Sequence, residues 1–146
     1  MWDSLNARVM ARLPHEVLNG TSNGVYGVKA RPNRRSWEES IAKLDEFRTY
    51  GHDWDGQGAA FGFPAKAFTE ELIDSAVALA VRLRQCGVLS PDCTVPDVQG
   101  GVGFEWDLEG GALIQIEICE PGAAEVFFFT SGKPTEHLTL AEAAMA

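Results

Sequence analysis

The spacing of apolar residues changes once along the chain, and this change limits the fold more than any other feature. Residues 64–86 carry apolar side chains every three or four positions, which is typical of a helix packed against a sheet. Residues 102–108 and 113–118 instead alternate apolar with polar side chains, which is typical of strands with one buried face. Helices facing a run of antiparallel strands make a two-layer α+β domain.

Local signals place the other elements. Trp2, Leu5, Val9 and Leu13 share one helical face, so we expect a short helix over 2–13. A second helix is predicted to begin after Ser36, which forms a capping box with Glu39, and to end at Gly51 in a left-handed cap. The helix over 64–86 is expected to have Pro64 in its first turn and to end at Gly87.

The strands are predicted to form a meander. The segments EGG (109–111) and EPGA (120–123) are hairpin turns, AEVFFFTS (124–131) is a third strand, and HLTLAEAAMA (137–146) is a short strand followed by a frayed helical turn. Residues 88–101 are interpreted as a connector interrupted by proline. We therefore expect two main helices packed on a three- or four-stranded antiparallel meander sheet, preceded by a short N-terminal helix and an arm.

Charge divides the chain unevenly. Residues 1–50 hold eight Lys/Arg and six Asp/Glu, whereas residues 51–146 hold four and fifteen. The N-terminal segment 1–35 is interpreted as a helix and a basic arm that carries Lys29, Arg31, Arg34 and Arg35, and 36–146 as a single α+β domain. An acidic body disfavours direct nucleic-acid binding and is compatible with a basic protein partner.

The sequence predicts a cytoplasmic protein with reduced thiols. No apolar run approaches the ~20 residues that cross a membrane, and the N-terminus lacks the apolar core of a secretory signal. Three cysteines, Cys86, Cys93 and Cys119, form neither a disulfide framework nor a zinc motif and are expected to be buried.

The stretch GHDWDGQGAAFG (51–62) is predicted to be a structural corner. The aspartates suit Asx-turn hydrogen bonds, the glycines suit backbone angles that other residues avoid, and the tryptophan is a large apolar anchor. We expect Trp54 and Trp106 to be buried and in contact. The predicted corner residues are Trp54, Asp55, Gly56, Gly58 and Trp106.

Chemistry at this corner is the alternative. A calcium loop is disfavoured because Gln57 and Pro64 stand where oxygen ligands belong. The histidines His15, His52 and His137 lack zinc-site spacing, so no metal or cofactor is expected. A small hydrolase or nucleotide-processing enzyme that uses Asp53, Asp55 and Glu105 stays open, although neighbours two apart do not share a face.

The third strand points to an interaction surface. Val126 and Phe128 must face one side of the sheet, and Phe127 and Phe129 the other. If the helices cover one side, Phe127 and Phe129 are exposed on the other. We expect them to be covered by a protein partner, by a second copy in a homodimer, or by the N-terminal arm through Trp2, Leu5 and Val9.

Three acidic side chains and one glutamine are also expected on one face of the strands. Glu105, Asp107, Gln115 and Glu117 share it, which is expected either of a solvated sheet face or of an acidic nucleic-acid mimic, like an anti-CRISPR protein, that inhibits a DNA- or RNA-binding enzyme. The residues predicted to contact a partner are Phe127, Phe129, Glu105, Asp107 and Glu117.

The motifs WDGQGA (54–59), GGVGFEW (100–106) and LIQIEI (113–118), separated by a helix and by Pro91 and Pro96, resemble a widespread family of small bacterial proteins of uncharacterised function. Its members show a W-D-G-x-G-A corner, a long helix and a G-G-[VI]-x-[LF]-E-W strand, and the resemblance covers roughly residues 45–120. Such proteins tend to be encoded among mobile elements and defence or toxin genes. The resemblance implies a non-enzymatic interaction role of antitoxin, immunity or inhibitor type, and brings no catalytic residues.

Overall fold

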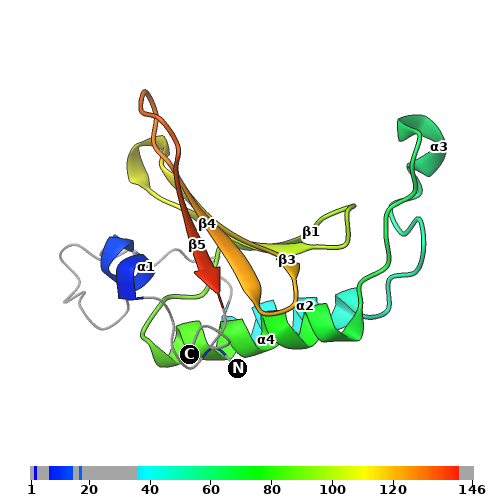
Figure 1. Cartoon of the computed structure of the whole chain (residues 1–146), viewed down its shortest axis with the longest axis horizontal. Helices are drawn as coiled ribbons and strands as arrows, with labels where there is room; N and C mark the ends of the chain where they lie inside the picture. Colours follow the sequence, from blue (N-terminus) through cyan, green and yellow to red (C-terminus); the bar gives the residue numbers. More distant parts are fainter. Residues whose placement is uncertain (1, 3–6, 15–16, 18–35, 142–146) are drawn as a thin grey trace.

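The computed structural model describes residues 2, 7–14, 17 and 36–141. A five-stranded antiparallel sheet forms one layer and helices form the other (Figure 1), which confirms the predicted α+β class. The strands are β1 (Cys93–Pro96), β2 (Val102–Asp107), β3 (Leu113–Glu120), β4 (Ala123–Phe129) and β5 (Glu136–Ala141). Strand order follows the sequence, so β1 and β5 are the edges of the sheet.

The two hairpin turns predicted from glycine-containing segments are present at the expected positions. The short 3-10 turn η3 (Glu109–Gly111) joins β2 to β3, and Gly110 and Gly111 there have φ values of 76° and 78°. Gly122 joins β3 to β4 with a φ of 75°. Because these left-handed values cost glycine little, both turns could be predicted from residue type alone.

Strand β1 is the element that the sequence does not predict. It is four residues long and ends at Pro96, inside the segment interpreted as a connector. Proline disrupts a central strand but is tolerated at a sheet edge, where a missing N–H breaks no ladder bond. The tail strand β5 is expected from the sequence, and with β1 it brings the sheet to five strands.

Helix α2 (Trp37–Phe47) begins as predicted and ends earlier than predicted. The Ser36 hydroxyl accepts a hydrogen bond from the Glu39 N–H at 3.1 Å. At the other end Arg48 keeps a right-handed helical conformation, and Gly51 does not adopt a positive φ, so the predicted left-handed cap at Gly51 is wrong.

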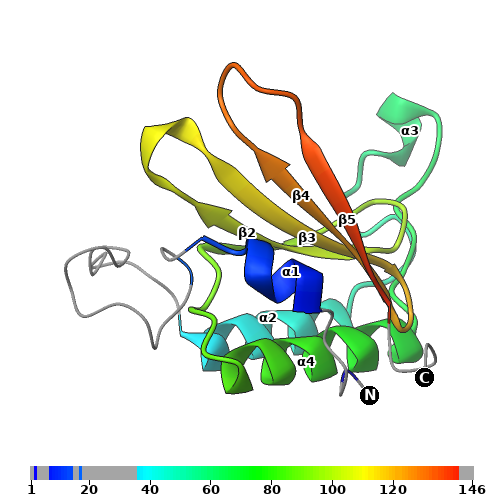
Figure 2. The same cartoon turned by 60° about the vertical axis from the view of Figure 1, so that its left-hand side comes forward.

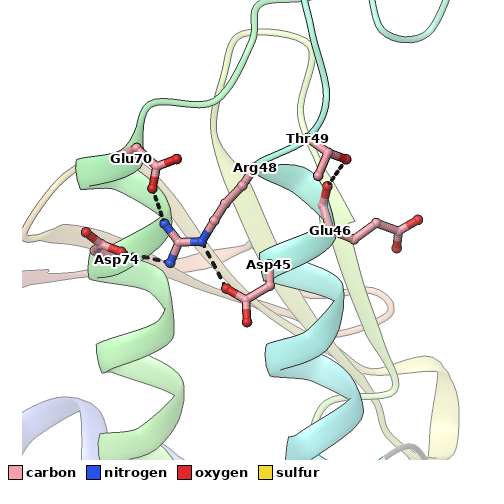
Figure 3. Close-up of polar contacts among 6 residues, drawn as sticks. All are labelled: Asp45, Glu46, Arg48, Thr49, Glu70 and Asp74. Atoms are coloured by element: carbon pink, nitrogen blue, oxygen red, sulfur yellow. Dashed lines mark hydrogen bonds and ion pairs between the residues drawn. The ribbon is translucent and has the colours of Figure 1, made fainter.

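Arg48 links this end of α2 to the neighbouring helix α4 (Glu70–Gln85) (Figure 3). Its guanidinium lies 2.9 Å from Asp45, 2.5 Å from Glu70 and 2.8 Å from Asp74. The hydrogen bond to Asp45 is the largest of several contacts that raise the pKa of Arg48. Asp45 lies on α2 itself, whereas Glu70 and Asp74 connect Arg48 to α4, which lies beside α2 (Figure 1).

Helix α4 begins at Glu70, six residues after the predicted start at 64, so the expectation that Pro64 lies in its first turn is wrong. The Thr69 hydroxyl caps it by accepting the Leu72 N–H at 3.2 Å. Before Thr69 the chain is held by the sheet instead, since the Lys66 N–H donates to the Val98 carbonyl at 2.9 Å. The predicted stop at Gly87 is confirmed: its φ is 85°, and the Val88 N–H bonds the Leu83 carbonyl at 3.0 Å, as in a Schellman motif.

The core lies between the helices and one face of the sheet. Helix α1 (Ala7–Arg12) lies on this same side (Figure 2), and Val9 is buried there. Trp2 is also buried and its indole N–H donates to the Ser75 carbonyl at 2.8 Å, while the Val17 carbonyl accepts the Leu89 N–H at 2.7 Å. The described part of the N-terminal segment therefore completes the helix-side core.

Two parts of the N-terminal prediction lie outside the described residues. These are Leu5 and His15, and the basic cluster Lys29, Arg31, Arg34 and Arg35. None of the described helices is long and apolar enough to cross a membrane.

Candidate functional site

The two faces of the sheet differ sharply in burial. The face toward the helices is buried along the central strands, where its side chains are Val102, Phe104, Trp106, Ile114, Ile116, Ile118, Ala124, Val126 and Phe128. The opposite face, here called the open face, carries no described helix (Figures 1 and 2). Its side chains include Glu105 and Asp107 on β2, Leu113, Gln115, Glu117 and Cys119 on β3, Glu125, Phe127 and Phe129 on β4, and His137 and Thr139 on β5.

Aromatic rings occupy one half of the open face. Phe127 stacks on Phe129 with ring centroids 6.0 Å apart, and on His137 with centroids 4.7 Å apart and the ring planes 8° from parallel. Both phenylalanines are partly exposed, whereas Val126 and Phe128 are buried on the other side. The alternation of β4 therefore places the side chains as the period of two predicts.

Carboxylates occupy the other half. Glu117 pairs directly with Glu125 across β3 and β4, a placement of like charges that is unfavourable in a sheet. Burial raises the pKa of Glu117, and the charges of Asp97, Glu125 and Glu105 raise that pKa further. We call these four side chains the carboxylate cluster. Each negative charge in it makes ionisation of the neighbouring carboxyl groups less favourable.

Two polar contacts join the halves. His137 Nε2 lies 3.2 Å from Glu125 Oε1, and the Gln115 amide donates to Glu117 Oε1 at 3.0 Å. Gln115 in turn pairs with Phe127 across β3 and β4. The rings and the carboxylates are thus one continuous surface.

Shallow hollows lie on both sides of Glu117. One, of about 150 Å³, is bounded by the β1–β2 hairpin and includes Asp97 and Gly103, and another, of about 230 Å³, includes Glu125 and Thr139. Gly103 lines the first hollow. A side chain there would be crowded, because an added Cβ would lie 3.3 Å from Val95 Cγ2 and 3.4 Å from the Ile116 carbonyl oxygen. Hollows of this size suit single side chains of a partner rather than a drug-sized ligand.

The five residues predicted to contact a partner all lie on the open face. Glu105 and Glu117 belong to the carboxylate cluster, and Phe127 and Phe129 to the aromatic half. Asp107 is at the end of β2, where its backbone N–H donates to Asp92 at 2.7 Å.

Sequence reasoning missed Asp97, Glu125 and His137. The alternation of β4 does place Glu125 on the same face as Phe127, whereas its contact with His137 depends on strand order and register, and Asp97 lies in the β1–β2 turn.

The exposure of the cysteines differs from the prediction. Cys93 and Cys119 are exposed and Cys86 is half-buried, so the expectation of buried thiols is wrong for the first two. Partial burial raises the pKa of Cys119, and nearby Glu117 adds to the rise. A raised thiol pKa makes this cysteine a poor nucleophile at neutral pH.

The corner at 51–62 is built around the two aspartates. Asp53 has a φ of 56°, and its carboxylate accepts the Gly58 N–H at 3.0 Å. Asp55 accepts the Gln57 N–H at 3.1 Å. Gly58 opens the short helix α3 (Gly58–Phe61), and an added Cβ there would lie 2.9 Å from Asp53 Oδ1.

The expected contact between Trp54 and Trp106 is wrong. Trp54 is only partly buried: its indole N–H donates to the Lys66 carbonyl at 2.9 Å, and its ring packs at a tilt against those of Tyr50 and Phe68, with centroid distances of 5.4 and 5.7 Å. Trp106 is buried at the far end of β2, where its N–H donates to the Leu89 carbonyl at 2.9 Å. The corner is tied through Lys66 to Val98 in the β1–β2 turn, about 13 Å of strand away from Trp106.

The geometry of the corner bears on the enzyme alternative. The carboxylates of Asp53 and Asp55 serve the turn, and no contact among the described residues joins either of them to Glu105. Within the described part of the chain, no three His, Cys, Asp or Glu side chains are grouped so that they could hold a metal ion.

The corner also projects an apolar tip that sequence reasoning missed. Phe61 and Phe63, in and just after α3, are 68% and 49% exposed, and α3 stands clear of the sheet (Figure 1).

Comparison of the chain with protein-family models, with curated proteins and with solved structures found no match.

Proposed function

We propose that the protein is a non-enzymatic interaction module that binds a basic protein through the open face of its sheet. The observation that carries this proposal is the joining of the carboxylate cluster to the stacked rings of Phe127 and Phe129 on one uncovered face. An arginine side chain suits both halves, since its guanidinium forms paired hydrogen bonds with carboxylates and stacks on aromatic rings.

The electrostatics of Glu117 support a cationic partner. In the free protein the raised pKa of this carboxyl reflects burial and the repulsion of neighbouring carboxylates. A partner's guanidinium or ammonium group supplies the missing positive charge and favours the ionised form. Binding therefore lowers the pKa of Glu117, and affinity falls as the pH drops through that pKa.

A homodimer is the less favoured form of this proposal. Each copy carries a net charge of −9, and a face-to-face dimer would bring two carboxylate clusters together. Strand β4 also lies inside the sheet between β3 and β5, so its backbone is not available for strand pairing. The resemblance to small bacterial proteins encoded near defence and toxin genes favours instead a regulator of antitoxin, immunity or inhibitor type.

A nucleic-acid mimic is a second candidate, and one specific observation favours it. Asp97, Glu105, Glu117 and Glu125 come from different strands and turns and nevertheless form one cluster. A spaced set of negative charges can occupy the basic groove of a DNA- or RNA-binding enzyme. In that case the partner is still a basic protein, and duplex DNA competes for it.

Site-specific photocrosslinking tests the proposal. A benzophenone amino acid is placed at Phe127 on the open face, and in a control variant at Val81, which is 40% exposed on α4. After irradiation in extract of the native cell, we expect one discrete product at Phe127 that is absent at Val81.

The partner captured in the crosslinked product is then identified and purified on its own. Its binding to the wild type and to the variants is measured by calorimetry. We expect binding that weakens with salt, weakens in Glu117→Gln and Phe127→Ser, and keeps its strength in Val81→Ser. Binding that is insensitive to both open-face substitutions contradicts the proposal. Competition by duplex DNA distinguishes the mimic from other interaction modules.

A further inference from the structure

A groove of about 500 Å³ lies between helix α2 and the edge strand β1, whose Cys93 pairs with Glu105 of the carboxylate cluster. Its size is within the usual range of ligand-binding clefts. The groove is partly open to solvent. One wall is formed by Glu39, Ser40, Ala42, Lys43 and Glu46 of α2, and the other by Cys93, Thr94 and Val95 of β1.

At this groove the backbone N–H and C=O groups of Thr94 are directed away from β2. The Asp97 N–H donates to the Gly101 carbonyl at 2.8 Å and closes the β1–β2 hairpin. Because backbone groups in an antiparallel pair alternate between the partner strand and the opposite side, Cys93 and Val95 bond β2. The N–H and C=O of Thr94 therefore face the free edge.

The side chain of Thr94 adds an independent sign of a missing ligand. Its hydroxyl oxygen is buried and has no hydrogen-bond partner in the described part of the chain. Buried hydroxyl groups without a partner are uncommon, because each loses the hydrogen bonds that water would provide. Thr94 thus lines the groove with an unpaired backbone edge and an unpaired hydroxyl.

We propose that this groove binds an extended peptide segment of another protein as an additional strand beside β1. The Thr94 N–H donates to a peptide carbonyl, the Thr94 C=O accepts a peptide N–H, and the hydroxyl bonds a further backbone group. On the other wall the Lys43 ammonium lies 3.0 Å from Glu46, so these two opposite charges compensate each other and recognition rests on the peptide backbone. This site is at the sheet edge, and it stands whether or not the open face binds a partner.

Thr94→Pro is the most specific variant for testing this site. Proline removes the outward N–H without breaking a bond to β2, and Pro96, two residues later, already occupies an equivalent position in the strand. Ala42→Trp blocks the groove from the helix side, and Ala59→Trp, on exposed α3, is its matched control. Thr94→Val removes only the hydroxyl. Circular dichroism and thermal melting verify that each full-length variant is folded.

The probe is a phage-displayed random peptide library selected on the full-length wild type. Labelled copies of the enriched peptides are then measured by fluorescence anisotropy. We expect them to bind wild type and Ala59→Trp equally, to lose at least about tenfold in affinity with Thr94→Pro and Ala42→Trp, and to bind Thr94→Val more weakly than wild type.

Three outcomes would overturn the proposal. The first is a library without enrichment over bait-free selection. The second is a set of enriched peptides that bind Thr94→Pro and Ala42→Trp as well as they bind wild type. The third is concentration-dependent self-association, seen by light scattering and removed by Thr94→Pro, which would make a second copy of the chain the occupant.

Discussion

Replacing Gly58 by alanine is the sharpest test of the corner. An added Cβ would lie 2.9 Å from Asp53 Oδ1 and 3.0 Å from Pro64 Cα. The second atom belongs to the backbone, so relief of the contact requires the chain to move. Overpacking of this kind costs about 1–3 kcal/mol, and the better helix propensity of alanine offsets up to about 1 kcal/mol.

We therefore expect Gly58→Ala to lose about 1–2 kcal/mol of unfolding free energy. For a chain of this size that loss corresponds to a melting temperature lower by about 2–8 °C. The assay is urea denaturation, supported by calorimetric melting.

Two other glycines of the same corner are matched controls. Gly51 has no atom within 4 Å of the added Cβ and no positive φ, so Gly51→Ala is expected to stabilise the fold by about 0.4–1 kcal/mol. Gly56 has equally open space but a φ of 69°, so Gly56→Ala is expected to cost about 1–2 kcal/mol through backbone strain alone. A Gly58→Ala protein as stable as Gly51→Ala would refute the packing argument.

Three further predictions concern burial and charge. Trp106→Ala is expected to cost about 3–5 kcal/mol, and Trp54→Ala less, because only Trp106 is fully buried; equal losses in urea denaturation would contradict this order. Glu117→Gln is expected to stabilise the free protein at neutral pH. Because the folded-state pKa of Glu117 is raised, its ionisation lowers stability as pH rises through that pKa, and the advantage of the glutamine should vanish in acid; a pH-independent difference would argue against it. Thr94→Val should leave the melting temperature unchanged or raise it, since it removes a buried unpaired hydroxyl; a clear loss would indicate a hydrogen bond at that oxygen.

Most of the fold could be predicted because its signals are local. The capping hydroxyl of Ser36, the stop at Gly87 and the glycine turns between strands act within a few residues of themselves. The errors arise where a distant segment overrides a local signal. The start of α4 is delayed because Lys66 bonds Val98, and β1 exists because Pro96 lies at a sheet edge.

The open face could be predicted only in part. The alternation within each strand is enough to place Glu105 and Glu117, and likewise Phe127 and Phe129, on the side of the sheet away from the apolar core. The same alternation places Glu125 there, but its pairing with Glu117 and its contact with His137 depend on the register of β3, β4 and β5, which no single strand determines. The error about Trp54 has the same origin, since the position of the corner along the sheet is set by a long-range backbone bond.

The most direct test of the central claim is an NMR titration of the full-length protein with a short oligo-arginine peptide. If the open face binds cationic side chains, the amide signals of Glu105, Glu117 and Phe127 shift first, and the shifts weaken with salt and in Glu117→Gln. Shifts spread evenly over acidic residues such as Glu71 on α4, or absent from the open face, would contradict the claim that this surface is built for a basic partner.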